Sequence, residues 1–413
     1  MKILIKNILL ENNVTDVLIE KDIFKTIGNI DANSIKIDTI IDGRDFAILP
    51  AFYNLHNHAA MTLLRGYCED LPLVPWLNNI WKKEATLTGE DIYNGTRLAI
   101  LEMIKSGTVF FADMYWFHKD ILRAVEEIGI RANIGVTFMD SLGKQKIEDN
   151  FAFLDEYAKY DNPLINFSPA PHAIYTCSDK LYKKCYENAE KNNLYLQTHL
   201  SETISEEKDC KKNNGGLSPI EYLDSLKVLN DKVIAAHCVH LSENDAKILA
   251  KRGVITVHNP CSNMKLADGV FNMSLAKRKG IKIALGTDGC SSNNNLSMTE
   301  EMKAAALLAK VTTMDTESLT AKEIFDIATK NGANFVGIDA GSIEEGKQAD
   351  CILVNLKNEK MIPNYDTIYN MVYSADTSCI DTVICAGKIL MRSHHVDNEE
   401  EIIDIARRYG KNN

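Results

Sequence analysis

Two histidines separated by one residue, His56 and His58, are the part of this chain best suited to metal chemistry. They lie in the segment PAFYNLHNHAAMTLLRG, which begins with a strand-like apolar run. Side chains two positions apart on a strand point to the same face, so both imidazoles would face one point in space. Neutral imidazole is a common ligand of several metals. Because two histidines can also share a face by chance, the pair needs support from elsewhere in the chain.

Three later motifs supply that support. The segment QTHLSE contains His199 and Glu202, AAHCVHL contains His237, and GTDGCSSNNN contains Asp288. Each follows a short apolar run that is typical of a buried strand. Several histidines with a carboxylate form a common ligand set for a metal ion. The sequence therefore predicts a metal site.

The elements that carry these motifs alternate between strand-like and helical segments. This alternation predicts an α/β fold with a (β/α)8 TIM-type barrel over residues 50–345. Its eight expected strands lie in segments 46–58, 108–114, 131–140, 164–172, 194–202, 233–241, 253–260 and 281–289. Active sites of such barrels gather at the carboxyl ends of the strands. The polar residues follow that rule, at His56, His58, His172, His199, His237, Asn259 and Asp288.

The two ends of the chain have a different pattern. Residues 1–49 contain short strand-like runs separated by Asn, Gly and Asp, and the pattern returns in residues 346–413. Ala386–Gly387 is placed where a hairpin would turn. We expect the two ends to build one small β-sandwich domain together, with a terminal helix in the second part.

Composition narrows the class of partner. The chain has 413 residues, 46 basic and 57 acidic, for a net charge of −11. That balance argues against nucleic acid. The ten cysteines form no C-x-x-C pair, which favours a reducing cytoplasm. The start, MKILIKNILLENN, is more typical of a first strand than of a signal peptide, and no run is long enough to span a membrane.

Several motifs together resemble one known family. They are HNHAAMTLLRGYCEDLPLVPWL, GTRLAILEMIKSGTVFFADMYW, APHAIYTCS, AAHCVHLSE, HNPCSNMKLADG and GTDGCSSNNNLSM. These motifs resemble the amidohydrolase superfamily and, more closely, its 5′-methylthioadenosine/S-adenosylhomocysteine deaminase branch. The resemblance covers nearly the whole chain, with the motifs in the family order.

The resemblance implies one divalent metal ion per subunit, zinc or alternatively iron(II), held by His56, His58, His199 and Asp288. Relatives with two metals bridge them through a carboxylated lysine after the fourth strand. The segment FSPAPHAIY has no lysine there, so we expect a single ion. Relatives often associate, and a homo-oligomer is left open.

The resemblance also implies hydrolytic deamination of 5′-substituted adenosines. Asp288 would accept the proton of the attacking water, and Glu202 would protonate the ring nitrogen. His237 would orient the attacking oxygen. Alternatively, Glu202 is a solvated glutamate in an acidic loop with Glu206 and Glu207.

Substrate contacts follow from the same resemblance. Glu84 matches a glutamate that binds the ribose hydroxyls, as a carboxylate can accept two hydrogen bonds from a diol. It could equally be a surface charge on a helix. His172 would bond to the nucleoside, and Trp76 would be either an apolar wall for the 5′ substituent or ordinary core.

The loop after the third expected strand departs from the family pattern. Members that act on S-adenosylhomocysteine are expected to place arginine there to clamp the amino-acid carboxylate. This chain has FMDSLGKQKIEDN, with Lys144 and Lys146 but no arginine. Lys146 is therefore the candidate contact, and 5′-methylthioadenosine, 5′-deoxyadenosine and adenosine are equally credible substrates.

The sequence is also compatible with two other functions. The same hydrolytic core could act on another aromatic amine or halide, such as guanine, a pterin or an s-triazine. A catalytically silent barrel with a structural or interaction role is the remote alternative. Such a protein is expected to lose metal ligands, and this chain has all four.

Overall fold

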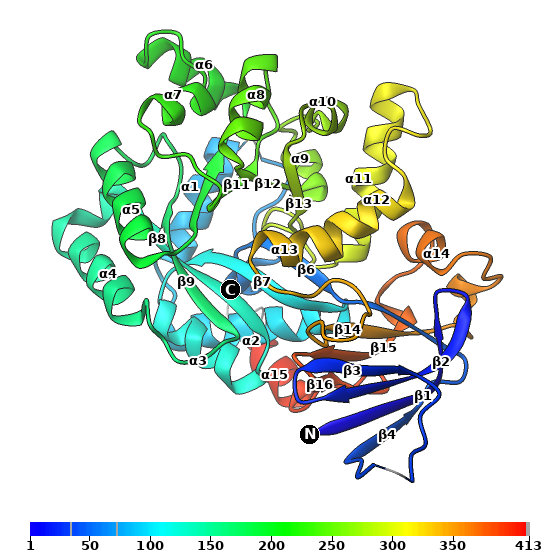
Figure 1. Cartoon of the computed structure of the whole chain (residues 1–413). Helices are drawn as coiled ribbons and strands as arrows, with labels where there is room; N and C mark the ends of the chain where they lie inside the picture. Colours follow the sequence, from blue (N-terminus) through cyan, green and yellow to red (C-terminus); the bar gives the residue numbers. More distant parts are fainter. Residues whose placement is uncertain (34, 72, 410–413) are drawn as a thin grey trace.

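The computed structural model describes residues 1–33, 35–71 and 73–409 of the chain (Figure 1). It contains two four-stranded parallel sheets surrounded by helices, and one larger sheet on one side of them. The α/β prediction is confirmed.

Each parallel sheet has its strands in chain order. The first consists of β6 (Phe52–Asn57), β7 (Thr108–Tyr115), β8 (Arg131–Phe138) and β9 (Ile165–Pro171). The second consists of β10 (Leu196–Leu200), β11 (Val233–His237), β12 (Ile255–His258) and β13 (Lys282–Leu285). All eight residues of β7 and of β8 are buried, as expected of parallel strands that are covered on both faces.

The two parallel sheets meet at both seams. After β13, the amide of Asp288 donates a hydrogen bond to the carbonyl of His56 on β6 (3.0 Å). In β10, the amide of His199 donates to the carbonyl of His172, which follows β9 (3.0 Å). The carboxyl ends of the strands therefore face one common region. No strand ladder joins the two sheets in the described residues, so the closed barrel stays a prediction.

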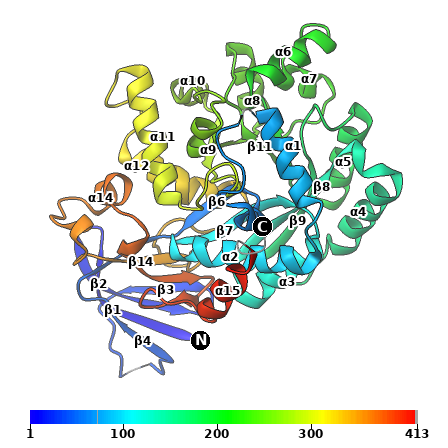
Figure 2. The same ribbon diagram turned by 180° about the vertical axis from the view of Figure 1, so that it is seen from behind.

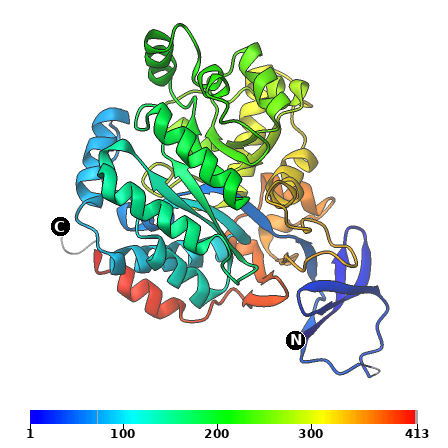
Figure 3. The same ribbon diagram turned by 60° about the vertical axis from the view of Figure 1, so that its left-hand side comes forward.

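Helices cover the outside of the sheets, and α3, α4 and α5 lie one after another along β8 and β9 (Figure 3). Their starts carry the expected caps: Thr88 and Asp91 form a capping box at α2, and Ser242 and Asp245 form another at α8. The helices of this region are α1 (Leu73–Glu84), α2 (Gly89–Lys105), α3 (His118–Ile128), α4 (Gly143–Tyr157), α5 (Asp179–Asn192), α6 (Ile204–Asn213), α7 (Pro219–Ser225), α8 (Glu243–Arg252), α9 (Pro260–Lys265), α10 (Met273–Lys279), α11 (Met298–Thr313), α12 (Ala321–Asp326) and α13 (Gly332–Phe335).

The larger sheet is built from both ends of the chain (Figure 1). Leu49 of β5 pairs with Ile352 of β14 in an antiparallel ladder. The sheet order is β16-β15-β14-β5-β1-β2-β3, and β4 pairs with β1. These strands are β1 (Lys2–Leu10), β2 (Asn13–Glu20), β3 (Ile23–Gly28), β4 (Thr39–Asp42), β5 (Phe46–Pro50), β14 (Cys351–Asn355), β15 (Ile380–Cys385) and β16 (Lys388–Met391).

This sheet has a separate apolar core. Side chains from the first part of the chain, such as Ile5 and Val17, pack with Leu353 and Ile384 from the second part. The hairpin at Ala386–Gly387 lies between β15 and β16 as expected. A β-sandwich, which needs two sheets packed face to face, stays a prediction because these strands form one sheet.

Asp350, just before β14, links the larger sheet to the parallel sheets. Its buried carboxylate accepts hydrogen bonds from the Nε of Arg131 on β8 (2.9 Å), the amide of Ala386 (2.6 Å) and the hydroxyl of Tyr53 on β6. The two parts of the molecule therefore share one polar anchor.

The remaining α-helices belong to the part of the chain after β14. The expected terminal helix is α15 (Glu399–Ala406), and α14 (Thr367–Tyr373) precedes β15. Figure 2 shows α15 beside α2, where Glu401 pairs with Arg97 (3.2 Å). Among the described helices, none has the length and apolar character that a membrane span requires.

Candidate metal centre and surrounding cavity

Three residues at or near the carboxyl ends of strands, two of them site residues, have a backbone conformation that is rare without glycine. Ser201, His237 and Asp288 have φ angles of 50°, 74° and 61°. Left-handed backbone costs free energy for residues with a Cβ, and it concentrates at functional sites. The surrounding fold therefore holds these strand ends in a strained form.

Four of the predicted ligands come together at this end of the strands. The Nε2 of His58 lies 3.2 Å from Asp288 Oδ1 and 3.3 Å from the Nε2 of His199. The Nε2 of His56 lies 3.5 Å from the same Asp288 oxygen. One carboxylate oxygen and three ring nitrogens thus converge from β6, β10 and the loop after β13.

Backbone carbonyls set the orientation of two of these rings. The Nδ1 of His58 donates to the carbonyl of Met114 (2.7 Å), and the Nδ1 of His199 donates to the carbonyl of His172 (2.8 Å). With Nδ1 carrying the proton, each Nε2 presents a lone pair to the cluster. Such hydrogen bonds commonly orient metal-binding histidines.

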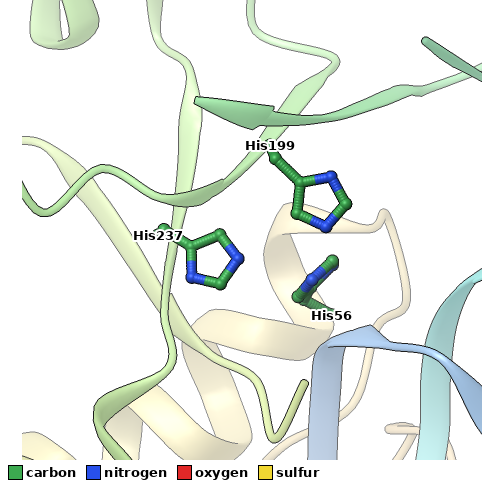
Figure 4. Close-up of side chains that lie close together, drawn as sticks. All are labelled: His56, His199 and His237. Carbon is green, nitrogen blue, oxygen red and sulfur yellow. The ribbon is translucent and has the colours of Figure 1, made fainter. Parts of the chain in front are cut away.

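The cluster has ligand atoms for a cation, and one of them lacks a hydrogen-bond partner. His56 Nε2 is buried and has no hydrogen-bond partner. Ligand atoms lie within 4.8 Å of one another in two groups, His56–His58–Asp288 and His56–His199–His237, which share His56. Figure 4 shows the rings of the second group pointing toward one another. Nitrogen and oxygen donors suit zinc or iron(II).

Asp288 is held as a carboxylate. Burial opposes its ionisation, but its contacts with His56 and His58 outweigh burial and lower its pKa well below the ordinary value. Its Oδ2 also accepts hydrogen bonds from the hydroxyls of Ser262 (2.6 Å) and Ser292 (2.8 Å).

The pKa of Glu202 is shifted in the opposite direction. Burial raises its pKa well above the ordinary value, and the neighbouring carboxylates of Asp268 and Asp288 raise it further. The carboxyl group is buried, so the alternative of a solvated glutamate does not describe it. Its Oε1 lies 3.6 Å from His237 Nε2. A carboxyl group with a raised pKa therefore lies beside the histidine cluster.

His237 is oriented by two amides. The side chains of Asn263 and Asn259 place their Nδ2 atoms 2.9 and 3.3 Å from His237 Nδ1. Because an amide nitrogen donates, His237 Nδ1 accepts, and the ring proton is on Nε2. That proton faces Glu202 and the cluster.

A cavity opens onto these groups. Glu84, Trp76 and His172 line it, together with His58, His199, Glu202, His237 and Asp288. The hydroxyl of Tyr115 donates to Glu84 Oε1 (2.5 Å), and burial raises the pKa of Glu84 to about 7. Glu84 thus faces the cavity and is not a charge on the outer surface of its helix.

Lys144 and Lys146 lie apart from the cavity. Both are exposed in the first turn of α4, and neither is among the residues that line it. The contact predicted for Lys146 stays a prediction.

Three residues that contact site residues are not predicted from the sequence. Ser262 and Asn263 lie in the HNPCSN motif after a strand. The sequence does not show that their side chains contact Asp288 and His237. Tyr115 ends β7, and its position at a strand end was the available signal.

Known proteins match this chain over most of its length. Residues 47–390 match the model of the amidohydrolase family. The chain belongs to this family. It is 44% identical to a 5′-deoxyadenosine deaminase of Methanospirillum hungatei, over 90% of this chain and 84% of that protein. It is 42% identical to a 5-methylthioadenosine/S-adenosylhomocysteine deaminase of Dictyoglomus turgidum, over 98% and 97% of the two chains.

A solved structure agrees with these matches. The crystal structure of an adenosine deaminase from Xanthomonas campestris with bound zinc superposes with a TM-score of 0.92, at 31% identity, over 99% of this chain and 98% of that chain. In this amidohydrolase, the histidine and aspartate cluster thus belongs to a fold with zinc-bound relatives.

Proposed function

We propose that this amidohydrolase is a metal-dependent deaminase that converts 5′-substituted adenosines and water into the inosine analogues and ammonia. The observation that carries the proposal is the meeting of the His56–His58–His199–Asp288 cluster and buried Glu202, whose pKa is raised, in one cavity. The names of the relatives from M. hungatei and D. turgidum support the substrate class.

The proposed ligands of the ion are His56, His58, His199 and Asp288, and zinc is the proposed ion. The zinc-bound relative supports zinc, and iron(II) is the alternative that the donors also suit. When bound, the ion acts as a Lewis acid that makes water acidic enough to serve as a nucleophile near neutral pH.

Three side chains handle protons in this proposal. The carboxylate of Asp288 accepts a proton from water. Glu202 gives its proton to the ring nitrogen next to the amino-bearing carbon, so negative charge does not build up on the purine. The C–N bond then breaks: Asp288 passes its proton to the amino group, which leaves as ammonia, and the new hydroxyl returns a proton to Glu202 as it becomes the carbonyl. His237 donates from Nε2 to the attacking oxygen and orients it, because Asn263 keeps its Nδ1 in the accepting form.

Substrate contacts are proposed for three further residues. Glu84 accepts hydrogen bonds from the ribose hydroxyls, and Tyr115 orients its carboxylate. His172 bonds to the nucleoside, with its Nδ1 held by the hydroxyl of Thr176 (3.1 Å). Trp76, buried in the cavity wall, packs against the 5′ side of the substrate.

The proposal includes the architecture. We propose that the two parallel sheets form a closed (β/α)8 barrel over residues 50–345, and that residues 1–49 and 346–413 form a separate domain. The seam hydrogen bonds of His199 and Asp288 support closure. All ten cysteines are unpaired, which supports a cytoplasmic location.

The first test is a substrate panel. Metal-replete protein is incubated with 5′-methylthioadenosine, 5′-deoxyadenosine, adenosine, S-adenosylhomocysteine and guanine, while ammonia release and the ultraviolet change from adenine to hypoxanthine are followed. Turnover of the adenosines is expected. If every adenosine stays intact while guanine or another aromatic amine is hydrolysed, the nucleoside assignment is wrong.

A further inference from the structure

The charged side chains that line the cavity are all acidic apart from the histidines. They are Glu84, Glu202 and Asp288, and no lysine or arginine is among the cavity's described lining residues. Lys265, near the rim residue Leu266, is already engaged by Glu69 (2.6 Å) and by the carbonyl of Ser291. A carboxylate on the substrate would therefore meet no lysine or arginine among the described residues that line the cavity.

The wall beside Glu84 is apolar over a long distance. On α1, the cavity-lining positions before Glu84 are Trp76, Leu77, Ile80 and Trp81. With a rise of about 1.5 Å per residue, the stretch from Trp76 to Glu84 extends over roughly 12 Å. Trp116 and Met61, from other elements, continue the apolar lining.

The position of Glu84 places the 5′ end of the substrate against this wall. This step rests on the proposed function, in which Glu84 binds the ribose hydroxyls and Glu202 the base. The 5′ substituent is attached to the same ribose ring, so it must leave the ring close to α1. From sulfur to its α-carbon, a homocysteine tail spans roughly 5 Å, by ordinary bond lengths. Its carboxylate would therefore lie beside apolar side chains and near acids.

We infer that the cavity selects adenosines whose 5′ group is short, uncharged and apolar, a hydrogen or a thioether, over those that carry an amino-acid carboxylate. Contact between a methylthio group and the apolar wall favours binding, because it removes apolar surface from water. A carboxylate loses hydration in the same place and gains no cation in return.

A matched pair of thioethers separates charge from size. 5′-n-Butylthioadenosine has the same four-carbon chain as S-adenosylhomocysteine without its charged groups. We expect kcat/KM for the butylthio and methylthio compounds to agree within about threefold, and to exceed the value for S-adenosylhomocysteine at least about tenfold, or about 1.4 kcal/mol. Equal values for S-adenosylhomocysteine and the methylthio compound would overturn the inference, as would equally poor values for both long-chain compounds.

A variant tests the missing cation directly. Leu77 is half-buried on the α1 wall. Leu77→Arg should raise the ratio of kcat/KM for S-adenosylhomocysteine over 5′-methylthioadenosine at least about fivefold, because it supplies a partner for the carboxylate. Leu77→Gln, long and polar but uncharged, should leave the ratio unchanged. If Leu77→Arg does not fold, the thioether comparison still decides.

A substitution of Lys146 tests the opposite possibility, that this lysine binds the carboxylate of S-adenosylhomocysteine. If Lys146→Ala lowers kcat/KM for S-adenosylhomocysteine about tenfold and spares 5′-methylthioadenosine, this lysine clamps the carboxylate and the inference is wrong. Failure of the proposed function would look different, since none of the adenosines would then be deaminated.

Discussion

Glu202 is a buried carboxyl group whose proton the fold binds more tightly than water-exposed surroundings would. Its burial and the nearby Asp268 and Asp288 act in the same direction, raising its pKa. A general acid is effective only if it holds its proton at the working pH. The same acidic surroundings thus serve the proposed chemistry, because they favour the acid form of Glu202.

The first prediction concerns this proton. Glu202→Gln keeps the shape of the side chain but removes the acid, so kcat should fall at least about 100-fold. Bound metal, measured by elemental analysis, should be unchanged, since Glu202 is outside the proposed ligand set.

The matched control is Glu187→Gln, a change at an exposed position of α5. It should leave kcat near the wild-type value. Near-normal turnover by Glu202→Gln would rule out the proposed role of this residue.

At the residue scale, the sequence was sufficient to predict polar site residues that lie at the ends of strands. His56, His58, His199 and Asp288 could be picked out because each follows a buried apolar run. The hydrogen bond of Tyr115 to Glu84 could not, because it joins β7 to the last residue of α1. Nor could the left-handed backbone of His237, since a histidine has no local preference that requires it.

At the scale of elements, α11 holds the loop that carries Asp288. Glu301, buried on α11, accepts hydrogen bonds from the amide of Cys261 (3.1 Å) and from the side chain of Asn293 (2.7 Å). Asn293 also donates to the carbonyl of Thr287, next to Asp288 (2.8 Å). One glutamate therefore connects the start of α9 to the metal-site loop.

The second prediction is a pH dependence of stability. Burial raises the pKa of Glu301 from 4.5 to about 8. The folded protein therefore binds this proton more tightly than the unfolded chain, and the free energy of unfolding should decrease as pH rises from about 4.5 to about 8. The slope from one such proton is at most about 1.4 kcal/mol per pH unit.

Urea titrations across that range measure this slope. In Glu301→Gln the slope should be shallower, because the titrating group is gone. Glu300→Gln, at the exposed adjacent position, should keep the wild-type slope. A Glu301→Gln slope equal to that of the wild type would show that Glu301 does not carry the effect.

Strands were predicted better than sheets. The alternation and length of apolar runs indicated where strands lie, and β15 and β16 turn at Ala386–Gly387 as expected. Pairing between distant segments has no local signal, so the ladder between β5 and β14 followed only from the similar pattern at the two ends. How the eight strands of this sheet are layered depends on bends and register shifts, such as that in β1 between Ile5 and Ile8, which composition does not encode.

At the scale of the whole molecule, Asp350 is the anchor between the larger sheet and the parallel sheets. The third prediction is that Asp350→Asn lowers the free energy of unfolding by about 3 kcal/mol, because it leaves the buried Arg131 without its charged partner. Denaturation midpoints and slopes in urea measure the loss.

An exposed pair of the same types is the control. Asp42→Asn breaks the contact with Arg44 at the surface, and it should lower the free energy of unfolding much less than Asp350→Asn does, because solvent screens an exposed pair. Similar losses in the two variants would mean that burial of the Asp350 pair does not matter.

The fourth prediction concerns the shared sheet. A chain ending at residue 345 loses β14, β15 and β16 and with them Leu353 and Ile384 of the apolar core. It should be insoluble when produced alone, and co-production of residues 346–413 should restore a soluble, active complex. A soluble and fully active 1–345 chain would contradict this.

The pairing of β5 with β14 also matters while the protein is being made. Leu49 leaves the ribosome about 300 residues before its partner Ile352. At roughly 5–20 residues per second, the gap lasts about 15 to 60 s. Throughout that time the edge of β5 has open hydrogen-bonding groups and can pair with another nascent chain. The last sheet strands to be synthesised thus set how long this edge stays unpaired.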